Sequence, residues 1–513
     1  MMESSQVVVV GAGPAGASAA IAASEAGLGV TLIDENPIDM SMMGLDIPLF
    51  FGQRMMPTVR DKGLMLQRVV SSNELLQEAQ EKSIEVLLGI YVWGSFRNQE
   101  NSRQLDRPVL GLANEERSWL MEYDRLVLAT GARDLVLGFP GRDLVGVMGA
   151  NAVVSLLNRY QAFTGKRIVV LGTGDLGLST AALALEQGIQ VAAIVDIAPS
   201  VRGDTELHSM LEGLGVPFYT SHTVMEARGH REVESILISR IDGQYLPIKG
   251  AERELECDTI CLAIGSVPNV ELSYLTGCRL SYRSQVGGFV PDRDQHTRTS
   301  IDSVYVAGDA GGFYEKMVTS PSIAIDQGRL AGLAAAKSLG AKDPDAAATS
   351  VKTLASSLDV PEDNGTGKYL EAWLSSLLAA GGMDINVCQC EEVTRSEILD
   401  VAPPRYLQWP SRRMGDRNIS TLLEEGPIDL DRLKRLTRVG MGYCQGRRCR
   451  EEVAMLVARA AGVDVSQVPL ASYRPPVRPL PLKVMWPHDE TDQVRSDWLK
   501  WFRTPTKEVK ELS

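Results

Sequence analysis

The chain begins with a short apolar stretch that runs directly into a turn of regularly spaced glycines. Residues 6–10 (QVVVV) are typical of a buried strand, Gly11-x-Gly13-x-x-Gly16 follows at once, and a helix is expected over Ala17–Ala26. Glycines at this spacing permit a tight turn, close approach of the backbone to a pyrophosphate, and packing of the helix on the strand. The order of strand, turn and helix therefore predicts an α/β dinucleotide-binding domain.

A second apolar strand, Val30–Ile33, ends at Asp34, at the distance from Gly16 that places a carboxylate beside the adenosine ribose. A ribose hydroxyl can donate a hydrogen bond to an acid in this position, and a second acid follows it. The residues expected to contact the dinucleotide here are Gly11, Gly13, Pro14, Ala15, Gly16, Asp34 and Glu35.

Two later segments indicate that this dinucleotide is FAD. Residues 126–132 resemble the strand and turn that close the FAD domain of two-dinucleotide-binding flavoproteins, and residues 303–309 resemble their late motif, whose aspartate contacts the ribityl chain. The FAD domain is therefore expected to be discontinuous, formed from residues 1–145 and 285–338. These segments add Thr130, Gly131, Ala132, Gly308 and Asp309 to the expected FAD contacts.

A second Rossmann-like unit is expected between the two parts, over residues 146–284. An apolar strand over Lys166–Leu171 precedes a second glycine turn and a helix over Leu178–Gln187, and the next strand, Val191–Val195, ends at an acid. The expected contacts with a second nucleotide, NAD or another adenine nucleotide, are Gly172, Gly174, Gly177 and Asp196.

One residue of this second turn argues against a bound nucleotide. Asp175 stands at the start of the helix, where it would cap the helix and repel a pyrophosphate. Whether the inserted domain binds a nucleotide therefore stays open.

Four of the seven cysteines lie in the last quarter of the chain, as Cys388-x-Cys390 and Cys444-x4-Cys449. Two tight pairs favour four thiolates around a [2Fe–2S] cluster. A structural zinc site and disulfides are the alternatives, but C-x-C is poor geometry for a zinc knuckle.

The sequence around the cysteines predicts a small helical [2Fe–2S] domain, BFD-like, over residues 386–470. Thr394-x-x-Glu397 is a capping box after the first pair, and Cys449 precedes a helix expected over Glu451–Ala461. A helical connector is expected over residues 339–385 and an extended tail over 471–513.

Composition restricts the partners. A net charge of −13 argues against nucleic acid. No apolar run approaches the ~18 residues that a membrane span needs, so no transmembrane segment is expected. Because the first residues pass directly into a strand, we expect a cytoplasmic protein, peripheral to the inner membrane only through a partner. The other cysteines, Cys257, Cys261 and Cys278, are expected to be reduced core residues.

The expected fold class is thus α/β: a two-dinucleotide-binding-domain flavoprotein, with a Rossmann-like domain inserted in the FAD domain, plus a small helical C-terminal [2Fe–2S] domain. These motifs, together with Tyr91–Gly94 and Gly440–Cys449, resemble the large (alpha, or A) FAD/[2Fe–2S] subunit of heteromeric amine and amino-acid dehydrogenases. That family includes opine oxidases, D-hydroxyproline dehydrogenase, dye-linked L-proline dehydrogenase and hydrogen cyanide synthase. The resemblance covers about residues 5–335 and 386–470.

The resemblance implies an electron-transfer subunit of a complex that oxidises a secondary amine or amino acid. In such complexes a D-amino-acid-oxidase-like flavoprotein subunit oxidises the C–N bond, a small ferredoxin-like subunit is often present, and an FMN at the subunit interface is compatible with the family. No catalytic residue can be assigned in this chain. Two alternatives stay open: a self-contained NADH-dependent FAD/[2Fe–2S] reductase, and a non-catalytic redox scaffold with a structural nucleotide.

Three segments depart from the family or extend beyond it. Met43–Gln53 stands where relatives often carry Gly-Gly-Gln, Ala402–Ser420 looks like an insertion, and the tail is either a wrap over its own domain or a partner-binding arm. A basic stretch near the cysteines is expected to steer an acidic redox partner or else to balance an acidic chain. It comprises Arg432, Lys434, Arg435, Arg438, Arg447, Arg448 and Arg450.

Overall fold

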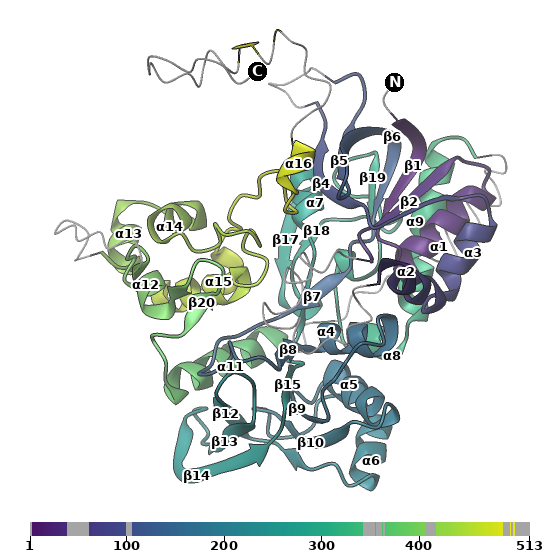
Figure 1. Ribbon diagram of the computed structural model, residues 1–513. Helices are drawn as coiled ribbons and strands as arrows, with labels where there is room; N and C mark the ends of the chain where they lie inside the picture. The colour runs from purple at the N-terminus through teal and green to yellow at the C-terminus, as the bar shows by residue number, and fades with distance from the viewer. Residues whose placement is uncertain are drawn as a thin grey trace, which may run out of the picture.

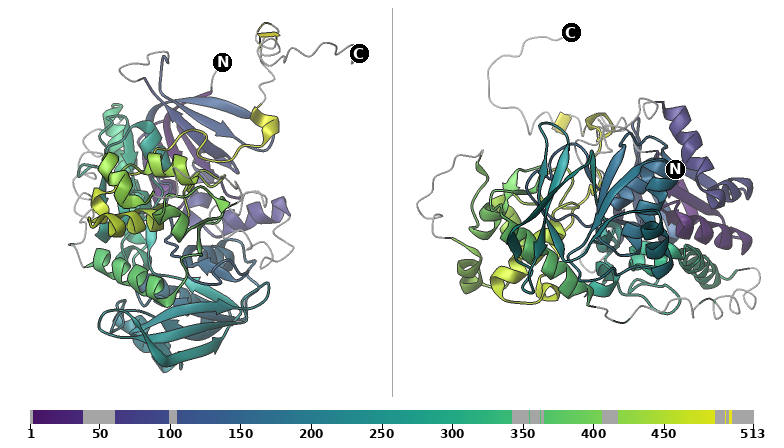
Figure 2. Two further views of the ribbon diagram at one scale, coloured as in Figure 1. Left: turned by 90° about the vertical axis from the view of Figure 1, so that its left-hand side faces the viewer. Right: turned by 90° about the horizontal axis from the view of Figure 1, so that it is seen from below.

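The computed structural model describes residues 3–37, 61–98, 105–341, 365–405 and 417–485, and the single residues 354, 362, 493, 496 and 497. Figure 1 shows two α/β units one above the other, with a small helical unit beside them. In the left view of Figure 2 the helical unit faces the viewer, in front of the α/β units. The segment Met43–Gln53, most of Ala402–Ser420 and the end of the tail lie outside the described residues.

The upper unit is built on a seven-stranded sheet of order β3-β2-β1-β6-β5-β4, with β19 beside β6. Val7, Val8 and Val9 in its centre are fully buried, which explains the continuous apolar run of the first strand. β1, β2, β3, β6 and β19 are parallel, whereas β4 and β5 form an antiparallel meander. The elements are β1 (Glu3–Val10), α1 (Pro14–Glu25), β2 (Val30–Asp34), α2 (Lys62–Ser71), α3 (Glu74–Glu81), β3 (Glu85–Leu88), β4 (Tyr91–Phe96), β5 (Val109–Ala113), β6 (Ser118–Leu128), β19 (Val304–Val306) and α9 (Ser322–Ser338).

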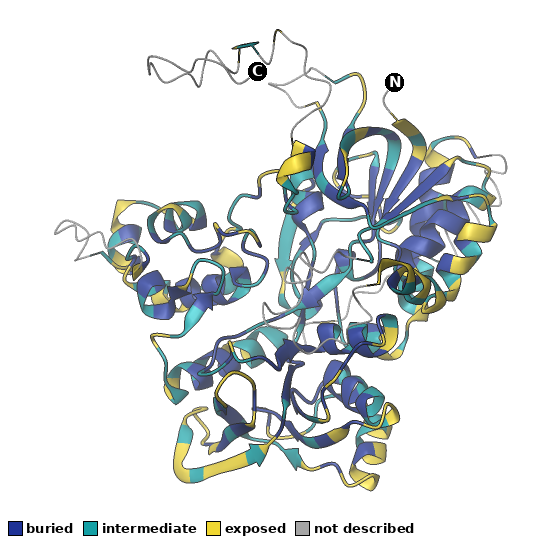
Figure 3. Ribbon diagram, viewed as in Figure 1, coloured by how far each residue is buried: buried dark blue, intermediate teal, exposed yellow. Residues whose placement is uncertain are grey.

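The lower unit is a five-stranded parallel sheet of order β11-β10-β9-β15-β8, beside an antiparallel sheet β12-β13-β14. The outward side of β14 is largely exposed (Figure 3). Its elements are β8 (Val147–Gly149), α4 (Ala150–Val154), the π-helix η4 (Ser155–Arg159), β9 (Arg167–Leu171), α5 (Asp175–Glu186), β10 (Gln190–Val195), α6 (Thr205–Gly213), β11 (Phe218–Tyr219), β12 (His222–Arg228), β13 (Ser235–Ile241), β14 (Pro247–Glu256) and β15 (Thr259–Leu262).

The chain passes between the two units twice, and the two crossings pair with each other as strands β7 (Ala132–Asp134) and β16 (Ser266–Pro268). After the second crossing the chain returns to the upper unit, which is therefore discontinuous in sequence. The predicted α/β class with an inserted Rossmann-like unit is confirmed. The return segment contains α7 (Glu271–Thr276), β17 (Leu280–Arg283), η5 (Ser284–Val286), β18 (Gly288–Pro291), η6 (Gly308–Gly311) and α8 (Lys316–Thr319).

The third unit is helical, as the sequence predicts. Thr394 caps its first short helix with the predicted capping box, and the helix expected after Cys449 begins at Arg450. Its elements are α11 (Thr366–Ala380), β20 (Asn386–Cys388), β21 (Val393–Thr394), α12 (Arg395–Leu399), α13 (Ile419–Glu425), α14 (Leu430–Thr437), α15 (Arg450–Ala461) and η9 (Val465–Gln467).

A buried ion-pair network attaches this helical unit to the crossing segment. Glu452 is fully buried and pairs with Arg142 at 3.3 Å and with Arg395 at 3.1 Å. Its second oxygen also accepts from the backbone N–H of Gly138 at 2.9 Å. Since a buried charge is tolerated only when it is paired and hydrogen-bonded, this arrangement fixes how α15 sits on the α/β units.

The described part of the tail wraps over the upper unit. The backbone N–H of Val477 donates to the carbonyl of Trp93 at 2.9 Å, and the guanidinium of Arg478 binds Glu35 at 2.7 and 3.1 Å. Val484, in α16 (Leu482–Met485), packs against Tyr91. These contacts agree with the interpretation of the tail as a wrap over its own domain. In the described part of the chain, no helix combines the length and the apolar character that crossing a bilayer requires.

Candidate functional site

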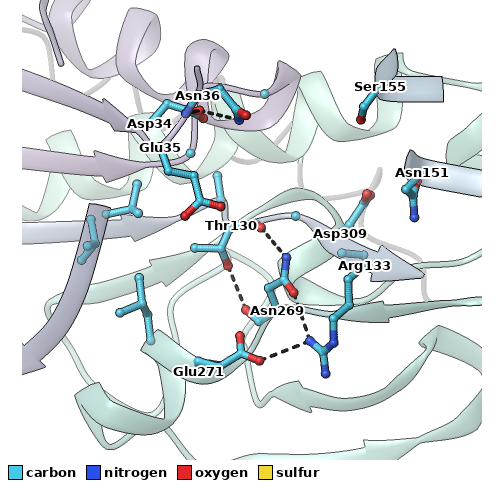
Figure 4. A pocket seen from close by; sticks show the side chains of 18 of the residues that line it. Asp34, Glu35, Asn36, Thr130, Arg133, Asn151, Ser155, Asn269, Glu271 and Asp309 are labelled. Carbon is cyan, nitrogen blue, oxygen red and sulfur yellow. Dashed lines mark hydrogen bonds and ion pairs between the residues drawn. The ribbon is translucent and has the colours of Figure 1, made fainter. Parts of the chain in front are cut away.

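A cavity of about 360 Å³ opens at the carboxyl ends of the parallel strands of the upper sheet (Figure 4). This is where open α/β sheets bind their ligands. Nine of the twelve residues expected to contact FAD line it: Gly11, Gly13, Pro14, Asp34, Glu35, Thr130, Gly131, Ala132 and Asp309. The other three, Ala15, Gly16 and Gly308, are buried and do not line it; a Cβ on Gly16 would lie 1.7 Å from the carbonyl oxygen of Gly11.

The glycine turn leaves the start of α1 free to bind an anion. Gly11 has a φ of +105°, and a Cβ there would lie 2.1 Å from the carbonyl oxygen of Ala129. Gly13 is the N-cap of α1, has no side-chain cap, and faces open space. The exposed N–H groups and the helix dipole therefore point at the position that a pyrophosphate needs.

The two acids at the end of β2 have different partners. Asp34 accepts from the backbone N–H of Ala12 at 2.5 Å and from Asn36 at 2.8 Å, so it braces the glycine turn. Glu35 is bound by Arg478 of the tail at the edge of the cavity. Asp34 thus keeps the position expected beside a ribose, while Glu35 is held by an ion pair.

Asp309 supplies the opposite side of the cavity. Figure 4 shows its side chain near those of Asn151 and Ser155, away from Glu35. Burial raises the pKa of Asp309 from 3.8 to about 6. No side-chain hydrogen bond of this carboxyl is found within the described residues, and a polar cofactor chain such as the ribityl group of FAD would supply one. The cavity therefore fits FAD at its phosphate, ribose and ribityl ends.

Arg133, one residue beyond the expected contacts, joins this cavity to the cysteine loop. Its guanidinium lines the cavity, pairs with Glu271 at 3.2 Å and Glu451 at 3.1 Å, and donates from Nε to the carbonyl oxygen of Arg447 at 2.6 Å. Arg447 lies between Cys444 and Cys449 in sequence. A single side chain thus connects the FAD cavity with the second cysteine pair.

The structure brings the four predicted cysteines together. The sulfur of Cys390 lies 3.7 Å from those of Cys388 and Cys444, and all four line one small depression at the surface. Cys388, Cys444 and Cys449 are buried. The backbone N–H of Gly440 points at the sulfur of Cys388 at 3.4 Å. Four convergent sulfurs with a backbone donor have the chemistry that a [2Fe–2S] cluster would need as ligands.

Cys390 and Cys444 each have a pKa that is raised by a neighbouring thiol and by burial. The neighbouring Cys388 thiol, together with burial, raises the pKa of Cys390 to about 11, and the Cys390 thiol and burial raise that of Cys444 further. Crowded thiolates therefore need a positive centre among them. Neighbouring sulfurs 3.7 Å apart are compatible with a pair of irons and equally with one tetrahedral zinc ion. Metal analysis therefore has to distinguish the two.

The basic stretch is only partly a surface, which corrects the prediction. Arg447 and Arg450 are buried, at 1% and 6% exposure, because they bind the tail and the network around Glu271. The network includes Arg133, Glu271, Arg450 and Glu451, whereas Arg432 and Arg438 pair with Glu425 and Glu391. Two of the seven basic residues are therefore buried, whereas the other five are exposed or half-buried. The steering of an acidic partner stays a prediction.

Several residues of the site carry no local sequence signal. Asn269 fixes the turn at Thr130. Its side-chain amide donates to the Thr130 carbonyl at 2.9 Å, and its backbone carbonyl accepts from the Thr130 hydroxyl at 2.8 Å. Glu271 and Arg478 reach the cavity from distant parts of the chain. Only Arg133 follows directly on a motif, so a search for charged residues beside the Thr130 turn could have found it.

The chain matches the pyridine nucleotide-disulphide oxidoreductase family over residues 5–328, more than half of its length, and belongs to that family. A sarcosine oxidase A3 domain also matches, over residues 414–487. With the FAD cavity described above, this makes the protein an FAD-dependent oxidoreductase.

Curated relatives are subunits of larger enzymes. The A subunit of opine oxidase from Rhizobium meliloti is 28% identical over 488 residues, covering 93% of this chain and 86% of that protein. The HcnB subunit of hydrogen cyanide synthase from Pseudomonas protegens is 25% identical over 517 residues, covering 94% and 98%. The alpha subunit of sarcosine oxidase from a Corynebacterium (strain P-1) is 28% identical, covering 65% of this chain and 32% of that protein. These relatives confirm the predicted resemblance.

Among solved structures, L-proline dehydrogenase from P. horikoshii shares the fold with a TM-score of 0.61. It is 22% identical and covers 95% of this chain and 81% of that one.

Proposed function

We propose that this protein is the FAD- and [2Fe–2S]-containing electron-transfer subunit of a heteromeric dehydrogenase or oxidase. The observation that carries the proposal is the contact of Arg133, which lines the FAD cavity and is bonded to the loop that holds Cys444 and Cys449. Two redox sites joined by one side chain suit the transfer of electrons from a two-electron carrier to a one-electron carrier. Cys388, Cys390, Cys444 and Cys449 hold the cluster.

The substrate class is a secondary amine or amino acid of the opine, proline or sarcosine type. The names of two relatives, which belong to an opine oxidase and a sarcosine oxidase, support this class. The amine is oxidised on a partner flavoprotein that resembles D-amino-acid oxidase. An FMN at the interface of the large subunits and a small ferredoxin-like subunit belong to the same proposal, as does a cytoplasmic location.

The partner follows from the chemistry of the described cavity. Oxidation of an amine requires the neutral amine, hence a base near the reacting carbon. Of the titratable groups that line this cavity, Glu35, Arg133 and Glu271 are paired, and we assign Asp309 to the ribityl chain. The proposal therefore assigns this chain to electron transfer and leaves the amine site to the other subunit.

Expression with and without the partner tests the proposal. The purified chain alone, supplied with an opine, proline or sarcosine and an artificial electron acceptor, should show no turnover. Co-expression with a D-amino-acid-oxidase-like flavoprotein of the same organism should give a complex that is active on one of them. Turnover by the single chain would refute its assignment to a heteromeric complex.

A further inference from the structure

The second glycine turn, in the lower unit, is filled by a side chain from the upper unit. Glu315, between η6 and α8, accepts from the backbone N–H of Leu176 in the first turn of α5 at 3.0 Å. A Cβ on Gly174 would lie 2.5 Å from the carboxylate of Glu315. In a dinucleotide-binding domain this space and this N–H serve the pyrophosphate. The Glu315 carboxylate stands where a phosphate oxygen would stand.

The acid that follows β10, Asp196, is completely buried, and both of its carboxylate oxygens accept hydrogen bonds. The N–H groups of Thr173 and Ala198 bind it at 2.6 and 2.9 Å, as two backbone N–H groups bind Asp34 in the upper unit. Asp196 differs in that its Oδ2 also accepts from the hydroxyls of Thr173 at 2.6 Å and of Tyr369, from α11, at 3.2 Å. A ribose hydroxyl would have to displace these two hydroxyls.

Side chains also cover the part of the lower unit where the adenosine of a bound nucleotide would lie. The guanidinium of Arg202 lies over the ring of Tyr369, 3.7 Å from its centre, and the backbone N–H of Arg202 donates to the Thr173 carbonyl. Two elements outside the Rossmann unit, the segment before α8 and helix α11, thus contribute Glu315 and Tyr369 to one cavity beside Arg202.

The charge at this helix end opposes a pyrophosphate. Asp175 does not cap α5, contrary to the expectation from sequence; its Oδ1 accepts from the N–H of Asp204 at 2.7 Å. Burial raises the pKa of Glu315 and the nearby Asp175 carboxylate raises it further, although the bond from Leu176 opposes this. Two carboxylates therefore share a position that must carry positive potential if a dinucleotide is to bind.

We propose that Glu315 and Tyr369 are specificity-determining residues that exclude NAD(H) from the inserted domain, so that a nicotinamide nucleotide does not supply the electrons of this flavoprotein. The inference goes beyond the proposed function. It concerns the second glycine turn and its neighbours, and it holds whether or not the cysteines carry iron.

The test uses the full-length, FAD-loaded chain, titrated with NAD⁺ in a calorimeter and mixed anaerobically with NADH while flavin absorbance is followed. The wild type and the control Lys316→Ala, an exposed neighbour of Glu315, should bind no NAD⁺ and keep an oxidised flavin. The double variant Glu315→Ala/Tyr369→Phe should bind NAD⁺ saturably, with a Kd at least about tenfold below the highest NAD⁺ concentration at which the wild type shows no binding.

Two outcomes overturn the proposal: saturable NAD⁺ binding or rapid flavin bleaching by NADH in the wild type, or a double variant that retains FAD and still binds no NAD⁺. If the double variant loses FAD, the single variant Glu315→Ala replaces it with the same criteria, since the Tyr369–Asp196 contact stays intact there. Either result is independent of iron content and of complementation by a partner subunit, which test the proposed function.

Discussion

The Nε of Arg133 lies 2.6 Å from the carbonyl oxygen of Arg447, although 314 positions separate the two residues in sequence. The same guanidinium binds Glu271 and Glu451, so the bond belongs to a buried network between the FAD cavity and α15. The network fixes the cysteine loop relative to the cavity, and electron transfer between two redox centres depends on such a fixed distance.

Replacing Arg133 by Gln should lower the free energy of unfolding by about 3–5 kcal/mol, because it leaves Glu271 buried without its main partner. Burial raises the pKa of Glu271, but Arg133 and Arg450 hold it below its ordinary value. The double variant Arg133→Gln/Glu271→Gln should recover part of the loss, a coupling of about 1–3 kcal/mol in urea denaturation. Strictly additive losses would show that the pair does not interact.

Replacing Asp309 by Asn should stabilise the FAD-free protein at neutral pH. The carboxyl titrates near 3.8 when exposed and near 6 in the folded chain. Between these values the folded chain binds more protons, so the stability of the wild type falls as the pH rises through this range. Asp309→Asn should therefore be more stable by about 1–3 kcal/mol at about pH 7.5 and equal to the wild type at about pH 4.

Denaturation of the FAD-free proteins at both pH values measures this difference. Asp302→Asn is the control, since the side chain of Asp302 is 95% exposed. An Asp309→Asn variant that is no more stable at neutral pH than the wild type would contradict the assignment of this half-buried carboxyl, to which the described residues donate no side-chain hydrogen bond, to the ribityl side of the cavity.

Replacing Glu452 by Gln should loosen the helical unit. The change leaves Arg142 and Arg395 buried opposite a neutral amide, at an expected cost of about 3–5 kcal/mol. In limited proteolysis, the variant should then be cleaved sooner than the wild type near the junction of the helical unit with the α/β units. The control Glu424→Gln, at an exposed position of α13, should behave as the wild type. Equal proteolysis of both variants would show that Glu452 does not hold the unit in place.

The sequence predicts the parts of this site that are local. The glycine turns, the apolar strands β1 and β9, and the cysteine pairs each have their periodicity or spacing within a few residues. The contacts of Arg133 with Arg447 and of Glu315 with Leu176 cannot be predicted in this way. They join residues from different units, and only the packing of those units decides which charge faces which helix end. The same reason explains why Arg447 and Arg450, surface-like in sequence, are buried.

Iron and sulfide analysis with electron paramagnetic resonance of the reduced protein tests the central claim most directly, because it asks whether the four cysteines hold a redox centre. The account predicts about two irons and about two acid-labile sulfides per chain, and a reduced-cluster spectrum. Both should be lost on replacing Cys388, Cys390, Cys444 or Cys449 by Ser, with FAD retained, and kept in the control Cys278→Ser, a buried cysteine outside the cluster. One zinc and no iron per chain, with no such spectrum, would contradict it.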